Sequence, residues 1–143
     1  MIRLVLVPRL VLVLAFLAAA CAGHSGSPGR TPLGQPFELR AGSSAAVEGG
    51  LQITFERVPA DSRCPMDALC IRAGEARVAL TVSQDGRNAD SRELRTDGAA
   101  SETTYLGFSI KLIALAPYPR SDRQILPEDY VATLTIRVQG SGF

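Results

Sequence analysis

Hydrophobic and polar residues alternate along much of the chain from Pro36 onward. A period of two is typical of β-strands that bury one face. The predicted inward faces are Phe37 and Leu39; Leu51, Ile53 and Phe55; Ala76, Val78, Leu80 and Val82; Phe108, Ile110 and Leu112; and Tyr130, Ala132, Leu134, Ile136 and Val138. No stretch shows convincing helical periodicity, so these segments predict an all-β protein.

The breaks in this pattern predict turns, a bulge and weaker strands. Asp85-Gly86 is a strong turn dipeptide, and Val58-Pro59 is expected to end the strand that begins at Leu51. The alternation slips near Ile113, which a β-bulge would explain. Weaker strands are expected at sheet edges, over residues 92–96 and 102–106.

Short strands separated by Gly, Pro and Asp turns favour an antiparallel β-sandwich with an immunoglobulin-like architecture. A small closed β-barrel is the alternative. Two stretches without alternation, 61–74 and 117–127, are expected to be long loops at the ends of this domain.

The N-terminal segment has the order of a secretory signal peptide. Arg3 and Arg9 precede an apolar run, and small residues lead to Cys21. The run, about 11 residues, is shorter than the roughly 20 that a spanning helix needs. Ala18-Ala19-Ala20-Cys21 resembles the lipobox of bacterial lipoproteins, in which the cysteine is acylated and becomes the first mature residue. We therefore expect a signal peptide at 1–20.

The rest of the chain is expected to be a tether and one domain. Residues 21–36 are rich in Gly and Pro and predict a flexible tether that begins at the lipidated Cys21. Residues 37–143 have the length of a single β-sandwich domain. Anchorage would be to a membrane of the bacterial cell envelope, and because Ala22 is not Asp, the outer membrane or its periplasmic face is weakly preferred.

Charge and cysteine count narrow the functions further. The signal contributes two of the 15 basic residues and none of the 14 acidic ones, so the mature charge is 13 minus 14, or −1. The arginines are scattered, which argues against a nucleic-acid partner. With Cys21 assigned to the lipid, Cys64 and Cys70 remain as a pair in an oxidising compartment, and we expect a disulfide.

The residues around this pair resemble a known signature. Asp61-Ser62-Arg63-Cys64-Pro65, Cys70 and Ala73-Gly74-Glu75-Ala76 are similar to a motif of small bacterial lipoproteins and exported proteins to which no activity is attached. With Leu115-Ala116-Pro117 and Asp129-Tyr130, the resemblance covers about residues 35–138. It implies a fold and a location. Relatives often carry Trp where this chain has Arg72.

The sequence offers few residues that could serve catalysis or metal binding. The only histidine, His24, lies in the predicted tether, which a histidine-dependent active site or a Cys/His zinc site cannot use. Asp61, Asp67 and Glu75 could form an acid/base or Ca²⁺ site, although the favoured interpretation is that Asp61 caps the loop and pairs with Arg63. We expect no catalysis, no metal and no cofactor.

The function predicted from the sequence is therefore a lipid-anchored structural or protein-interaction module of the envelope. Its partner would contact the loops through a set of polar and aromatic residues: Asp61, Arg63, Asp67, Tyr118, Arg120 and Arg123. The alternatives are an envelope enzyme that uses the loop carboxylates or the cysteine pair, and a small-ligand or metal carrier.

Overall fold

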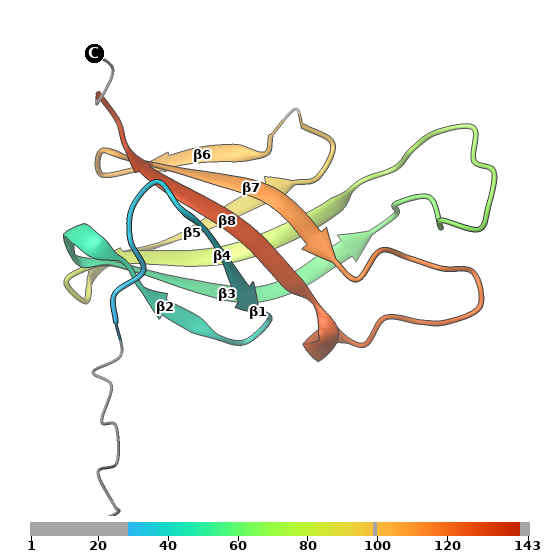
Figure 1. The fold of residues 1–143 in the computed structure, drawn as a ribbon, viewed down its shortest axis with the longest axis horizontal. Coiled ribbons are helices and arrows are strands. Elements are labelled where there is room, and N and C mark those ends of the chain that lie inside the picture. The colour runs from blue at the N-terminus through green and yellow to red at the C-terminus, as the bar shows by residue number, and fades with distance from the viewer. Residues whose placement is uncertain (1–28, 99, 141–143) are drawn as a thin grey trace, which may run out of the picture.

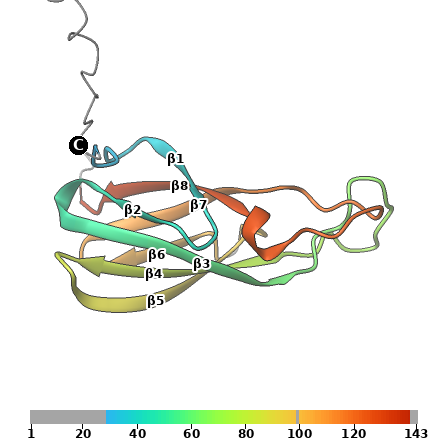
Figure 2. The ribbon, with the colours of Figure 1, turned by 90° about the horizontal axis from the view of Figure 1, so that it is seen from below.

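A computed structural model describes residues 29–98 and 100–140, so the predicted signal and Cys21 lie outside the described residues. Two four-stranded antiparallel sheets face each other, as Figure 2 shows, and they do not close into a barrel. The predicted β-sandwich is confirmed, and the barrel alternative is wrong.

One sheet joins the first strand of the chain to the last three, and the other consists of four consecutive strands (Figure 1). One sheet has the order β1 (Pro36–Arg40), β8 (Val131–Val138), β7 (Phe108–Ala116) and β6 (Glu102–Tyr105). The other has the order β2 (Ser44–Ala46), β3 (Leu51–Asp61), β4 (Ala76–Gln84) and β5 (Arg87–Arg95). Single 3₁₀ turns, η1 (Glu48–Gly50) and η2 (Pro127–Asp129), precede β3 and β8.

The core lies between the sheets and consists of the alternating apolar residues. Phe55, Ile53, Val78, Ile110 and Leu134 are all completely shielded from solvent. Each such side chain contributes about 1.5–3 kcal/mol of burial free energy, which makes this layer the main source of stability. Val138 is half exposed, unlike the prediction, because it lies at the outer end of β8.

The predicted turn and bulge are confirmed. Asp85 and Gly86 both have positive φ, at 49° and 71°, and they connect β4 to β5. Glycine and aspartate tolerate this left-handed geometry better than most residues do. The register between β7 and β8 shifts between Leu112 and Ala114, which places Ile113 at the bulge.

Two strand boundaries differ from the prediction. Strand β3 does not end at Val58-Pro59 but continues to Asp61, with register shifts against β4 on the way. These register shifts accommodate Pro59, which has no backbone N–H to donate to the neighbouring strand. Strand β5 spans the polar stretch Arg87–Arg95 because its backbone pairs with β4, although few of its side chains are buried.

The molecule is elongated, and its two ends differ. The loops 62–75 and 117–126 project together beyond the sheets at one end, in green and orange in Figure 1. The first described residues, in blue, lie towards the opposite end. We call the two projecting loops the tip.

Candidate interaction site at the loop tip

A buried ion pair forms the root of the tip. Arg63 is 7% exposed, and its Nε and Nη2 donate to the two oxygens of Asp61 at 2.9 and 2.6 Å. The backbone N–H of Arg63 also donates to Asp61 Oδ1, at 3.1 Å. This is the predicted pairing of Asp61 with Arg63. The planar fork of arginine suits such bidentate contact, which holds the first turn of the loop.

The same guanidinium joins the two loops. Arg63 Nη1 donates to the carbonyl oxygen of Leu115 at 2.7 Å, and Nη2 donates to that of Pro117 at 3.0 Å. Strand β6 pairs with β7 only as far as Lys111, so the outer edge of β7 continues without a strand beside it. Arg63 donates to Leu115 on this part of β7 and to Pro117 just beyond it, and a charged side chain beside an unpaired strand disfavours pairing with another chain.

Two tyrosines contact this ion pair. Tyr130 donates its hydroxyl to Asp61 Oδ2 at 3.1 Å, and the ring of Tyr118 lies 5.0 Å from the Arg63 guanidinium carbon. Burial alone would raise the pKa of Asp61, but the hydrogen bonds and charge of Arg63 outweigh it and hold that pKa below the ordinary value. Burial and the neighbouring Asp61 charge raise the pKa of Tyr130.

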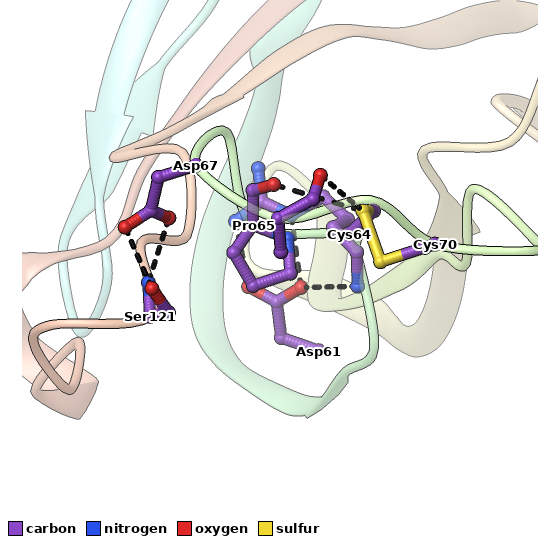
Figure 3. Close-up of a disulfide and its surroundings, with 8 residues drawn as sticks. Asp61, Cys64, Pro65, Asp67, Cys70 and Ser121 are labelled. Carbon is purple, nitrogen blue, oxygen red and sulfur yellow. Dashed lines mark hydrogen bonds and ion pairs between the residues drawn. A yellow bond between two sulfur atoms is a disulfide. The ribbon is translucent and has the colours of Figure 1, made fainter.

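The first loop is closed by a disulfide between Cys64 and Cys70 (Figure 3). Its two limbs remain paired below the bridge, where Ser62 N donates to the Glu75 carbonyl and Cys64 N donates to the Ala73 carbonyl, both at 2.8 Å. The predicted disulfide is thus present, and it fixes the shape of a loop that contributes no side chain to the apolar core.

Gly74 has a structural reason to be glycine. Its φ is +67°, and a Cβ there would overlap the carbonyl oxygen of Ser62 on the opposite limb. Any other residue would both strain the backbone and push the limbs apart. The Ala-Gly pair of the sequence signature therefore lets the two limbs approach each other.

The second loop lies beside the first through Asp67. Its carboxylate accepts hydrogen bonds from the backbone N–H of Ser121 at 2.9 Å and from the Ser121 hydroxyl at 2.6 Å. These bonds hold the pKa of Asp67 below its ordinary value. Met66 N donates to the Pro119 carbonyl at 3.0 Å. In Figure 3, Asp67 points towards Ser121 and away from Asp61.

The first loop of the tip exposes three large apolar side chains, which the sequence interpretation missed. Leu69 and Ile71 are fully exposed, at 105% and 104%, and Met66 is 68% exposed. These residues lie inside a loop, where no periodicity distinguishes a buried side chain from an exposed one. The available signal was the presence of three large aliphatic residues within a disulfide ring and its flank.

Cationic side chains accompany this apolar surface. Arg72 is exposed and follows Ile71 directly. On the neighbouring loop, Arg120 and Arg123 both pair with the one carboxylate of Asp122, at 3.2 and 3.6 Å. The tip thus presents aliphatic side chains together with a surplus of positive charge.

The predicted site residues separate into two groups. Asp61 and Arg63 lie in the root, where they hold the loops, whereas the more exposed members lie on the surface of the tip: Asp67, Tyr118, Arg120 and Arg123. The carboxylates weighed as an acid/base or metal site do not share one partner, because Asp61 binds Arg63, Asp67 binds Ser121 and Glu75 binds Arg95. Within residues 29–98 and 100–140, no cluster of three metal-ligating side chains occurs.

A hollow of about 430 Å³ lies beside the root. Arg63, Gly74, Thr96, Ile113 and Tyr118 line it, among others. The Arg63 guanidinium makes four hydrogen bonds within the protein, so most of its donors are already engaged. The hollow therefore offers an apolar wall rather than a strong anion site.

Comparison with known proteins assigns no class to this arrangement. No family model, no curated protein and no solved structure matches the chain. In the part of the chain that the structure describes, no helix has the length and apolar character needed to cross a bilayer.

Proposed function

We propose that this protein is a lipid-anchored interaction module of the bacterial cell envelope that holds its loop tip away from the membrane. The lipid would be carried by Cys21. The tether would be shorter than the predicted 21–36, because Thr31 bridges Val47, Gly34 N donates to the Ile136 carbonyl and Pro36 begins β1. The tip would contact an envelope protein through its exposed residues, without catalysis.

The observation that carries this proposal is the separation of the two ends of the domain. The tip lies at one end of the long axis, and the chain enters the domain towards the other (Figure 1). A tether attached there would direct the tip away from the anchoring surface. Binding surfaces carried on loops at the end of a rigid β-sandwich are a common arrangement.

The enzyme and metal-site alternatives have less support. An acid/base pair or a Ca²⁺ site needs carboxylates that converge, and Asp61, Asp67 and Glu75 each contact a different partner. The cysteine pair is bridged between Cys64 and Cys70, in a loop that has no helix N-terminus to lower a thiol pKa.

Mass spectrometry of the full mature protein from its source cells tests the anchor. The proposal predicts a chain that begins at Cys21, carries acyl groups and contains a Cys64–Cys70 bridge. A Cys21→Ser variant should leave the membrane fraction. Cleavage at another residue, or an unmodified Cys21 in a membrane-bound protein, would contradict the lipid anchor.

A further inference from the structure

We infer that the tip binds an apolar cleft of a partner protein whose rim carries carboxylates, with Leu69 and Ile71 as the inserted side chains. This inference rests on the proposed interaction role and adds the chemistry of the partner.

Leu69 and Ile71 make no use of their apolar surface within the domain. Both are fully exposed, while Cys70 between them is bridged to Cys64. A large aliphatic side chain gains free energy when it leaves water, so a cleft that accepts both residues would bind them favourably. Because the bridge and the Met66–Pro119 and Asp67–Ser121 hydrogen bonds already order the loops, little further ordering would oppose binding.

The charges around these residues define the rim of the cleft. Arg72 forms no ion pair with any described residue, and Arg120 and Arg123 share Asp122. Carboxylates on the partner would meet the remaining positive charge, which steers association and disfavours basic partners. Arginine is also a residue type that is enriched in binding hot spots.

A partner protein suits the tip better than a bilayer or a second copy. With the tether at the opposite end, the tip of an anchored chain would point away from its own membrane (Figure 1). Copies anchored on the same surface would direct their tips the same way, so the tip of one would not face the tip of another.

Photo-crosslinking of the full chain in its source cells tests this inference. Benzoylphenylalanine would replace Ile71, and the matched control would carry it at Leu106, an exposed leucine on the β6–β7 hairpin outside the tip. A third chain would carry it at Arg120. Adducts would be identified by mass spectrometry of the crosslinked peptides.

The inference predicts a discrete protein adduct at position 71 and none at position 106. The crosslinked partner peptide should lie in an apolar cleft with Asp or Glu at its rim. In the chain that carries the probe at Ile71, Leu69→Ser should lower the adduct yield by about tenfold, and so should Arg72→Glu combined with Arg123→Glu.

Several results would overturn it. An adduct to lipid, an adduct with twice the mass of the chain, equal yields at positions 71 and 106, or the absence of any adduct at position 71 would each do so. An adduct at position 71 that is indifferent to charge reversal would refute the acidic rim. An adduct at position 120 without one at position 71 would refute the apolar insertion but leave the interaction role standing.

Discussion

The body of the sandwich and its tip are held together by different physical interactions. In the body, large apolar side chains such as Phe55 and Leu134 are completely buried between two sheets. In the tip, a buried ion pair, a disulfide and hydrogen bonds between loops maintain the shape, while Leu69 and Ile71 face water. Apolar burial therefore stabilises the body, and polar and covalent links stabilise the tip.

This difference supports the interaction role proposed for the tip. A loop that contributed to folding would turn its aliphatic residues towards the core. Here the loop is ordered without them, which leaves them available to a partner.

Truncation of the core should have the largest effect. Phe55→Ala removes a completely buried ring and should lower the free energy of unfolding by about 3–5 kcal/mol. Urea denaturation of the purified chain measures this. A loss below about 1 kcal/mol would contradict the view that apolar burial holds the body.

Loss of the Arg63 guanidinium should come next. Arg63→Met leaves the Asp61 carboxylate unpaired and deprives the Leu115 and Pro117 carbonyls of their donor. We expect a destabilisation of about 3 kcal/mol, as for other buried pairs that lose one partner.

The control for Arg63→Met is the double variant Asp61→Asn, Arg63→Met. It removes the unpaired carboxylate charge and should therefore be more stable than Arg63→Met alone. Arg63→Lys should recover little, because an ammonium cannot reproduce the planar fork. Wild-type stability in Arg63→Met would show that the root of the tip does not depend on this residue.

Removal of the disulfide should have a moderate effect. Cys64→Ala with Cys70→Ala opens a ring whose cysteines are six positions apart, and the chain-entropy model assigns so small a ring about 2 kcal/mol. Hydrogen exchange should increase in residues 62–75 and remain unchanged in β4 and β8. Faster exchange throughout the core would show that the tip and the body do not open independently of each other.

Acid should weaken the root through Asp61. Its pKa is lowered in the folded state, so its contribution is complete above the unfolded value near 3.8 and is lost as the pH falls through the folded value. As the pH falls below about 4, the free energy of unfolding of Asp61→Asn should therefore decrease less than that of the wild type. Identical acid profiles for the two proteins would contradict a stabilising charge at Asp61.

Substitutions on the tip surface should have the smallest effect on stability. Leu69→Ser should change the free energy of unfolding by less than about 0.5 kcal/mol, because the side chain has no burial to lose. A destabilisation close to that of Phe55→Ala would mean that Leu69 packs against the protein in solution.

The body could be predicted from the sequence because its signals are local. The alternation over Leu51, Ile53 and Phe55 identifies a buried face, and the phase slip identifies the bulge at Ile113. The extent of β5 could not be predicted, because that strand is polar and its pairing partner sets its length.

The tip resisted prediction because its contacts are distant in sequence. Asp61–Arg63 is a local pair and was predictable, but the carbonyl acceptors of Arg63 lie 52 and 54 residues further along the chain. Nothing local marks Arg63 as buried. The exposure of Leu69 likewise depends on which side of the ring faces the body, which depends on loop packing and not on the residue pattern.

The most direct test asks whether the polar and covalent links of the tip serve to present its apolar residues. The yield of the crosslink at Ile71 would be compared between the wild-type chain and one with Cys64→Ala and Cys70→Ala, both at equal abundance in the cell. We predict a strong loss of the adduct from the bridge-free chain while its body remains folded. An undiminished yield would contradict the account.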